Sequence, residues 1–300
     1  MNTDKLPYIV GRGAVLPDAL RLGPVRLAVT NLDRSIAFYT GIVGLVVIGR
    51  GQEGPYEVAH LGVDGEDIVV LQQEPTARRA GRHTGLYHVA LNYPTRLELA
   101  RTARRLAESR TPIQGSANHQ THEAIYLPDP DGNGLELAWD FPREQWPTTL
   151  DEMISGNQGL DMLDLLRQTA NEDLVPHAAP GLRVGHLHLH VGDLSRAVVF
   201  YQDLLGFEQQ MNMGTGIFFS AGAYHHHLAV NIWRGHAAPP PDAVGLREWR
   251  IYLPDLASVA STRARLTAGG AAINAADETA FTTEDPWGIP LYVALDPRRS

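Results

Sequence analysis

A single acidic residue stands in an apolar stretch at position 136. Residues 135–139 read LELAW, and this alternation predicts a strand with Leu135 and Leu137 on one side and Glu136 on the other. A carboxylate in such a strand is costly unless it is solvated, paired or bound to a metal ion. Two interpretations of Glu136 are therefore open, a solvent-facing side chain and a metal ligand.

Two histidines occupy matching places in two similar segments. His186 stands three residues before Leu189 at the start of one expected strand, and His88 stands three residues before Leu91 in another. A lone histidine at a strand start is commonly a surface or hydrogen-bonded residue, but two at matching places favour a shared role. With Glu136 they form the two-histidine, one-carboxylate set that leaves coordination positions open on non-haem Fe(II).

Other histidines compete for such a role. His188 and His190 alternate with His186 along one strand face, and neighbouring histidines of that kind can chelate zinc. The run His225–His227 precedes an expected strand, LAVNIW. Consecutive strand residues point to opposite faces, so only one or two of the three would reach a shared cleft. The polar rim of a hairpin is the plain alternative for this run.

The composition restricts the accompanying chemistry. The 300-residue chain has no Cys, which excludes disulfides, thiolate nucleophiles and thiolate metal sites, so any metal is held by nitrogen and oxygen. Its 25 Lys and Arg against 34 Asp and Glu give a formal charge of −9, which argues against a nucleic-acid partner. The sequence shows no signal peptide and no apolar run of about 18 residues, so we expect a cytoplasmic protein without a membrane partner.

The acidic segment PDPDGNG at residues 128–134 has the composition of a turn. Its spacing also imitates a calcium-binding loop, but the strand alternation that follows it and Asp140, where such a loop needs Glu, argue against that interpretation. We expect a hairpin turn between a strand at residues 124–127 and one at residues 135–139.

The chain contains an internal repeat. Residues 25–45 and 187–207 align without a gap, and each begins with alternating apolar residues that predict a strand. Asn31 in one copy and Asp193 in the other suit the N-cap of a helix. Each copy therefore predicts a strand, a cap, a helix and a glycine stop.

A weaker form of this unit recurs, with helices expected at residues 96–109 and 256–268. The fold class is α+β, and about 150 residues per domain predicts two domains. We expect an N-terminal domain (1–145), a linker with one short helix (146–183) and a C-terminal domain (184–300). The expected βαβββ modules are 24–73, 86–140, 184–234 and 246–295.

These features resemble the vicinal oxygen chelate superfamily (glyoxalase, bleomycin resistance and extradiol dioxygenase proteins), and in it the two-domain catechol 2,3-dioxygenase subgroup. The resemblance spans nearly the whole chain through GLYHVAL, EAIYLPDPDGNGLELAWD, VGHLHLHVGDL, AGAYHHHLAVNIW and DPWGIPLY. The extradiol signature is met by His119, Tyr126 and Glu136, with Ala117 the one atypical position. It implies two vicinal-oxygen-chelate domains with mixed, cupped β-sheets.

The resemblance also implies the roles of individual residues. His88, His186 and Glu136 would be metal ligands for Fe(II), with Mn(II) as the alternative and O₂ as co-substrate. Catalysis and substrate contact would fall to a second group. His226 matches the family's acid/base histidine, His119 and Tyr126 match the pair that contacts the catechol oxygens, and His227 is expected at the substrate.

The ligands come from the second and third modules, whereas usual two-domain relatives take all of them from the C-terminal half. The first and fourth modules have Pro24 and Glu248 where the others have histidine, and the fourth has Tyr292 in place of Glu136. Pairing of modules within each half would leave neither half with three ligands. We therefore expect module two to pair with module three, within one chain or between two chains.

The resemblance implies an extradiol, meta-cleaving dioxygenase of aromatic catabolism that acts on a small catechol-type diol. Another metal-dependent glyoxalase-type enzyme and a metal-free protein that binds aromatic compounds are the alternatives. Candidate pocket walls are Trp233, Trp249, Trp287 and the proline-containing loop at residues 236–242. The ring substituents, the choice between iron and manganese, and the presence of a homo-oligomer are open.

Overall fold

The computed structural model of the protein describes residues 16–79, 81–148, 152, 158–222, 224–274 and 277–299. They form two compact units of mixed α+β structure. Unit 1 holds the described residues of Met1–Arg26, Ala80–Tyr87 and His186–Ser300, and unit 2 holds those of Leu27–Arg79 and His88–Gly185. Each unit contains two repeats of a strand, a helix and further strands, which confirms the predicted fold class.

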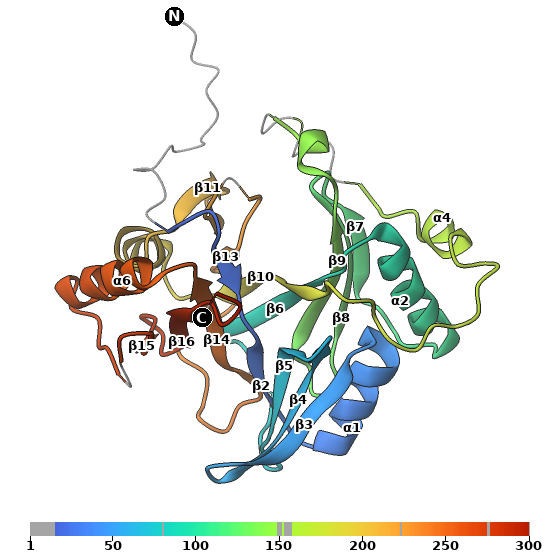
Figure 1. Cartoon of the computed structure of the whole chain (residues 1–300), viewed down its shortest axis with the longest axis horizontal. Helices are drawn as coiled ribbons and strands as arrows, with labels where there is room; N and C mark the ends of the chain where they lie inside the picture. The colour runs from blue at the N-terminus through green and yellow to red at the C-terminus, as the bar shows by residue number, and fades with distance from the viewer. Residues whose placement is uncertain are drawn as a thin grey trace, which may run out of the picture. The chain divides into compact units, whose positions relative to one another are not determined.

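Unit 2 begins with the first module, whose order of elements is the predicted one. The elements are β2 (Val25–Val29), α1 (Leu32–Phe38), the π-helical turn η1 (Tyr39–Val43), β3 (Val46–Glu53), β4 (Tyr56–Val63) and β5 (Glu66–Gln73). Asn31 caps α1 as predicted, because its side chain accepts a hydrogen bond from the backbone N–H of Arg34 at 2.8 Å. Gly44 ends the helical segment in a left-handed conformation, with a φ of 92°. Helix α1 packs against β4 and β5 (Figure 1).

The second module of unit 2 carries the predicted hairpin. Its elements are β6 (Gly85–Asn92), α2 (Arg96–Glu108), β7 (Gly115–Asn118), β8 (His122–Pro128) and β9 (Gly134–Asp140). The strands run in the order β6-β9-β8-β7, with β6 parallel to β9 and the other pairs antiparallel. The short helix expected between residues 146 and 183 is α4 (Met162–Arg167), and it packs against α2 (Figure 1).

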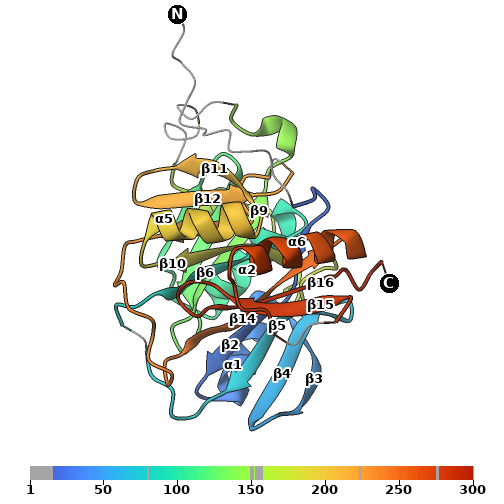
Figure 2. The same ribbon diagram turned by 90° about the vertical axis from the view of Figure 1, so that its left-hand side faces the viewer.

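Unit 1 contains the third module. Its elements are β10 (Arg183–His190), α5 (Leu194–Ala197), the π-helical segment η3 (Val198–Leu204), β11 (Glu208–Asn212), β12 (Gly216–Ser220) and β13 (Leu228–Asn231). Asp193 caps α5 as predicted, by accepting from the backbone N–H of Arg196 at 2.8 Å. β10 is parallel to β13, and α5 covers one face of this sheet (Figure 2).

The fourth module, also in unit 1, departs from the βαβββ pattern. Its elements are β14 (Gly245–Leu253), α6 (Leu256–Ala268), β15 (Ala280–Glu284) and β16 (Pro290–Leu295), and β1 (Arg21–Leu22) pairs with β14. In its described residues two strands follow the helix instead of three. An isolated bridge between Asn274 and Thr282 stands where the additional strand was expected. The fourth module thus keeps the order of strand, helix and strands in its described residues, in a shortened form.

The sheet of the second module separates apolar from polar residues. One face is apolar and buried, as the alternation in the sequence predicts, and α2 packs against β9. The residues of this face are each 1% exposed or less: Val89, Leu91, Leu135 and Leu137. The polar side chains of β6 and β9 therefore lie together on the opposite face.

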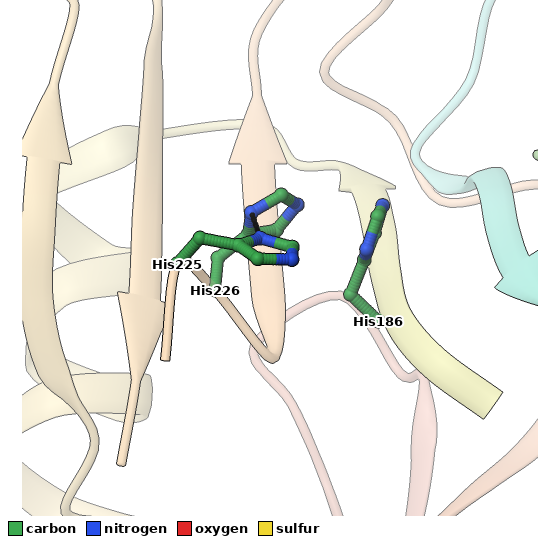
Figure 3. A group of neighbouring side chains, drawn as sticks. All are labelled: His186, His225 and His226. Carbon is green, nitrogen blue, oxygen red and sulfur yellow. Dashed lines mark hydrogen bonds between the residues drawn. The ribbon is translucent and has the colours of Figure 1, made fainter. Parts of the chain in front are cut away.

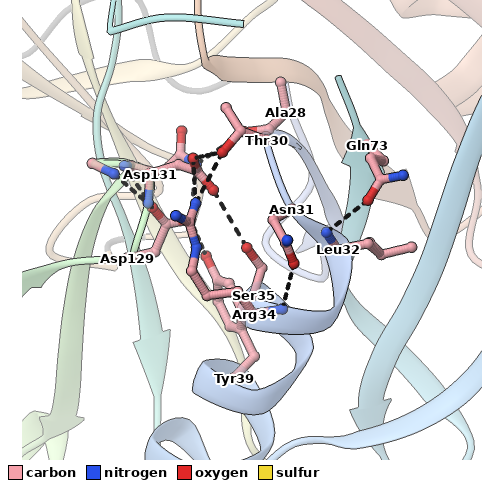
Figure 4. Close-up of polar contacts among 12 residues, drawn as sticks. Ala28, Thr30, Asn31, Leu32, Arg34, Ser35, Tyr39, Gln73, Asp129 and Asp131 are labelled. Atoms are coloured by element: carbon pink, nitrogen blue, oxygen red, sulfur yellow. Dashed lines mark hydrogen bonds and ion pairs between the residues drawn. The ribbon is translucent and has the colours of Figure 1, made fainter. Parts of the chain in front are cut away.

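The turn between β8 and β9 is held by polar contacts within the turn and to the first module (Figure 4). Oδ1 of Asp129 accepts the backbone N–H groups of residues 131, 132 and 133 at 2.8 to 2.9 Å. The Tyr39 hydroxyl donates to Oδ2 of Asp129 at 3.3 Å, and Arg34 pairs with Asp131 at 2.7 Å. Both aspartates bind protein groups, which agrees with a turn and not with a calcium loop.

Among the residues that the structure describes, each helix is too short or too polar to cross a bilayer.

Candidate functional site

The polar face of unit 2 combines two ionisable residues with small ones. In the strand register Ala90 of β6 lies beside Glu136 of β9, and Tyr126 of β8 lies on the other side of Glu136. Because side chains alternate along a strand, His88 shares this face with Ala90, and Ala138 shares it with Glu136. The two alanines occupy little space, so the functional groups of His88 and Glu136 can meet.

The carboxylate of Glu136 is buried between two imidazoles. Its side chain is 1% exposed. His88 Nε2 lies 2.9 Å from Oε2, and His122 Nε2 lies 2.9 Å from Oε1. The solvent-facing interpretation of Glu136 is therefore wrong, and the interpretation as a ligand is compatible with its surroundings. The sequence analysis singled out His88 and overlooked His122.

His122 is a buried partner of Glu136. Its Nδ1 lies 2.9 Å from the hydroxyl of Thr121. Burial alone would lower the pKa of His122, but the hydrogen bond to Glu136 and the negative charges of Glu136 and Asp140 outweigh it and raise the pKa. The alternation His122, Ala124, Tyr126 along β8 is the signal in the sequence that could have revealed it, because all three share the face of Glu136.

Two other predicted residues, His119 and Tyr126, contact each other in unit 2. His119 Nε2 lies 2.8 Å from the Tyr126 hydroxyl, and the Tyr126 ring centroid lies 5.6 Å from that of His88. Ligand atoms of His119, His122 and Glu136 lie within 4.8 Å of one another. Unit 2 thus brings together four of the seven predicted site residues: His88, His119, Tyr126 and Glu136.

Unit 1 holds a second imidazole group (Figure 3). His186 lies in β10 on the same side as His188 and His190, and it is 2% exposed. Ligand atoms of His186, His225 and His226 lie within 4.8 Å of one another, and the rings of His186 and His226 are 4.0 Å apart. His225 Nδ1 and His226 Nδ1 are 2.8 Å apart, so the two rings share a hydrogen bond. The predicted His226 is therefore beside the predicted His186.

His227 lies outside this group. Its Nδ1 is 3.1 Å from the Ser220 hydroxyl, and its ring stacks on Phe207 with centroids 6.2 Å apart. The structure thus places His225, and not His227, beside His226. The triplet precedes β13 and is not itself a strand, so strict alternation of its side chains does not apply.

The remaining histidines of β10 are joined by one amide. Asn231 lies 2.8 Å from His188 Nε2 and 2.7 Å from His190 Nδ1. The metal-ligand groups formed by the described residues do not include His188 or His190, so the zinc alternative gains no support. Tyr87 and Trp233 pack against His188 with ring centroids 5.0 and 5.4 Å away.

The three candidate wall tryptophans have different surroundings. Trp233 is 50% exposed and accessible to a ligand. Trp249 is fully buried in the core, 6.4 Å from the Tyr201 ring, so its assignment to a pocket wall is wrong. Trp287 is 8% exposed and lies under the guanidinium of Arg196 at 5.6 Å.

The donor groups of unit 2 fit a divalent transition metal. Imidazole nitrogen and carboxylate oxygen, in a chain without thiolates, are the ligand types used by Fe(II) and Mn(II). A buried carboxylate costs free energy unless a cation or hydrogen-bond donors compensate it. His88 and Glu136 supply one nitrogen and one oxygen on a buried face, 2.9 Å apart.

Similarity to known proteins extends over most of the chain. The family model of the Glyoxalase/Bleomycin resistance protein/Dioxygenase superfamily matches twice, over residues 21–137 and 183–291. A catechol-2,3-dioxygenase from Bacillus subtilis (strain 168) is 34% identical over 273 residues, which is 88% of this chain and 93% of that protein.

Solved structures with the same fold have lower sequence identity. A candidate dioxygenase from Bacillus subtilis subsp. subtilis str. 168 has a TM-score of 0.69 at 14% identity, covering 96% of this chain and 87% of that one. Glyoxalase I from Zea mays has a TM-score of 0.59 at 17% identity, covering 92% of each chain. At these identities the likeness establishes the fold alone. The two family-model matches and the 34% identical relative show that the chain belongs to the Glyoxalase/Bleomycin resistance protein/Dioxygenase superfamily.

Proposed function

We propose that the protein is an extradiol ring-cleavage dioxygenase that opens a catechol-type vicinal diol with O₂ at a non-haem Fe(II). The observation that carries the proposal is the buried pair of His88 and Glu136, with nitrogen and oxygen 2.9 Å apart. The catechol-2,3-dioxygenase relative, 34% identical over 88% of the chain, supports the reaction class. We propose His186 as the third ligand, because it occupies in its module the place that His88 occupies in the second.

The bound metal would bring the diol and O₂ together and favour the ionised form of the diol hydroxyls. Side chains of the protein would accept and donate the protons. Tyr126 and His119 are 2.8 Å apart, so a proton from a diol hydroxyl near Tyr126 can pass to His119. We expect His226 to accept the proton of the second diol hydroxyl and to donate it to an oxygen that comes from O₂ as the ring opens. Its contact with His225 fixes the orientation of its ring.

The reaction class can be tested with one assay. Protein purified without oxygen and loaded with Fe(II) is mixed with catechol and O₂ in an oxygen electrode. We expect stoichiometric O₂ consumption and a yellow ring-cleavage product. Metal binding without O₂ consumption would favour a glyoxalase-type isomerase, and absence of metal binding would favour a passive aromatic-binding protein.

The ligands can be tested by substitution. We expect Glu136→Ala and His186→Ala to lose metal retention and turnover, because a two-histidine, one-carboxylate site has no spare ligand. His226→Ala should retain iron and lose turnover. His60→Ala is the matched control, since His60 lies on the surface between Asp67 and Glu53. An active Glu136→Ala enzyme would overturn the proposal, and undiminished metal affinity in His186→Ala would exclude the third ligand.

A further inference from the structure

His122 has a hydrogen-bond partner on each ring nitrogen, and both lie in unit 2. Thr121 Oγ1 is 2.9 Å from Nδ1, and Glu136 Oε1 is 2.9 Å from Nε2. His122 is 5% exposed, and Glu136 is 1% exposed, so water competes little for these contacts. The three side chains therefore form a chain of hydrogen bonds that ends on the carboxylate.

The partners define the direction of these hydrogen bonds. A carboxylate only accepts, so His122 Nε2 must carry the proton that it donates to Oε1. In the neutral ring Nδ1 is then the acceptor, and the Thr121 hydroxyl can donate to it. In the protonated ring Nδ1 donates to the Thr121 oxygen instead. In either state the contact with Thr121 holds the ring in the orientation in which Nε2 donates to Glu136.

The two oxygens of Glu136 have different neighbours. Oε2 is the oxygen that faces His88, the proposed ligand, and Oε1 is the oxygen that faces His122. A carboxylate held through one oxygen presents the other in a fixed direction. The fourth module lacks this arrangement: Tyr292 replaces the carboxylate, and Glu278 stands four residues before Thr282, where His122 stands four before Tyr126.

We propose that His122 is a positioning residue that holds Oε1 of Glu136, so that Glu136 binds the metal through Oε2 alone. This inference rests on the proposed metal role of Glu136. Hydrogen-bonded partners of ligating carboxylates typically contribute about 10- to 100-fold to metal affinity or activity. The role proposed for His122 is to position Glu136, not to bind the metal or the substrate.

The test compares donor-retaining and donor-removing variants of the full chain. His122→Leu removes the donor, His122→Gln places an amide N–H near the former Nε2, and Thr121→Val removes only the contact to Nδ1. Affinity for Fe(II) and for Co(II) is measured anaerobically by chelator competition, together with the visible spectrum of the Co(II) form. We expect His122→Leu to weaken binding by about 10- to 100-fold and to alter the spectrum. His122→Gln should restore most of the affinity, and Thr121→Val should show a smaller loss.

The outcomes separate this inference from the proposed function. Wild-type affinity and spectrum in His122→Leu, with Glu136→Ala unable to bind metal, would overturn the role of His122 alone. Undiminished affinity in Glu136→Ala would overturn both. Circular dichroism verifies the fold of each variant. If His122→Leu does not fold, the other two variants decide. Metal affinity equal to that of the wild type in both Thr121→Val and His122→Gln would overturn the inference, whereas reduced affinity in both would support it.

Discussion

The turn at residues 128–133 in unit 2 and the turn at residues 284–289 in unit 1 share one construction. Asp285 Oδ1 accepts the backbone N–H groups of residues 287 and 289 at 2.8 Å, as Asp129 does in its own turn. Tyr201 donates to Asp285 at 2.6 Å, and Tyr39 donates to Asp129 at 3.3 Å. Burial raises the pKa of each tyrosine well above its usual value, so both hydroxyls stay protonated and donate.

Arg34 and Arg196 occupy equivalent positions of the repeat, but they interact differently with the two turns. Arg34 pairs with Asp131 at 2.7 Å in unit 2, whereas Arg196 lies 5.6 Å above the Trp287 ring in unit 1. Gly192 precedes α5 at the position that Thr30 holds before α1, and a Cβ there would come within 2.5 Å of Trp287 Nε1. An ion pair in one unit thus corresponds to a cation–π contact in the other.

The strands that follow the two turns differ more. Where Ala90 lies beside Glu136 in the second module, Arg250 lies beside Tyr292 in the fourth. Arg250 pairs with Glu248 at 2.6 Å and lies 4.9 Å above the Tyr292 ring. A guanidinium therefore lies on the face that carries His88 and Glu136 in the second module. The turn framework is thus present in both units, while the residues of the polar face differ.

The largest effect is expected when the second module is given the arginine of the fourth. We expect Ala90→Arg to place a guanidinium beside Glu136, as Arg250 lies beside Glu248, and to lower metal affinity and turnover by about 100-fold or more. The measurement is anaerobic metal titration with an O₂-uptake assay. Arg250→Ala is the control and should leave metal affinity unchanged. Normal affinity in a folded Ala90→Arg protein would contradict this reading of the two faces.

Removal of the tyrosine hydroxyls has an intermediate effect. Each substitution, Tyr39→Phe or Tyr201→Phe, deletes a buried hydrogen bond to a carboxylate and should cost about 1 to 3 kcal/mol of unfolding free energy. The loss should be larger at Tyr201, because its bond is shorter and because Asn133 also donates to Asp129, at 2.8 Å. Urea unfolding of the two variants measures the difference. The reverse order would show that the two turns are not held in the same way.

The smallest effect on stability is expected from replacing Arg34 or Arg196. The two losses are expected to depend on pH in different ways. Burial alone would raise the pKa of Asp131, but hydrogen bonds from Thr30 and Arg34 lower it. The stabilisation by ionised Asp131 is therefore complete above the pKa of about 3.9 that the residue has in the unfolded chain. It is lost as the pH falls through the lower pKa that Asp131 has in the folded protein. Arg34→Ala should cost up to about 1 kcal/mol at neutral pH, and this cost should disappear in acid.

The matched substitution in unit 1 should respond differently to acid. Arg196→Ala should cost about 0.5 to 1 kcal/mol at neutral and at acidic pH alike, because the Trp287 ring does not titrate. Urea unfolding across this range, at low and high salt, checks both variants. A cost of Arg34→Ala that persists in acid would show that Arg34 acts by packing and not through Asp131.

Local features could be predicted from the sequence because their causes are local. Asn31 and Asp193 are followed by helices, and the turn residues 128–134 join two strands, as side-chain chemistry and turn propensity require. The alternation around Glu136 predicted which side of β9 it would occupy, because strand side chains alternate by two. The repeated pattern likewise determined the α+β class.

Contacts between strands and loops were decided only by the tertiary structure. The register of β8 on β9 brings His122 to Glu136, and the loop before β13 turns His225 toward His186 and His227 toward Phe207. Trp249 is buried because of what packs around its strand, which no local pattern indicated. The sequence by itself thus determined the repeated modules and limited the donor groups of any metal site to nitrogen and oxygen. Packing and register, which depend on residues distant in the chain, determined which imidazoles surround the carboxylate.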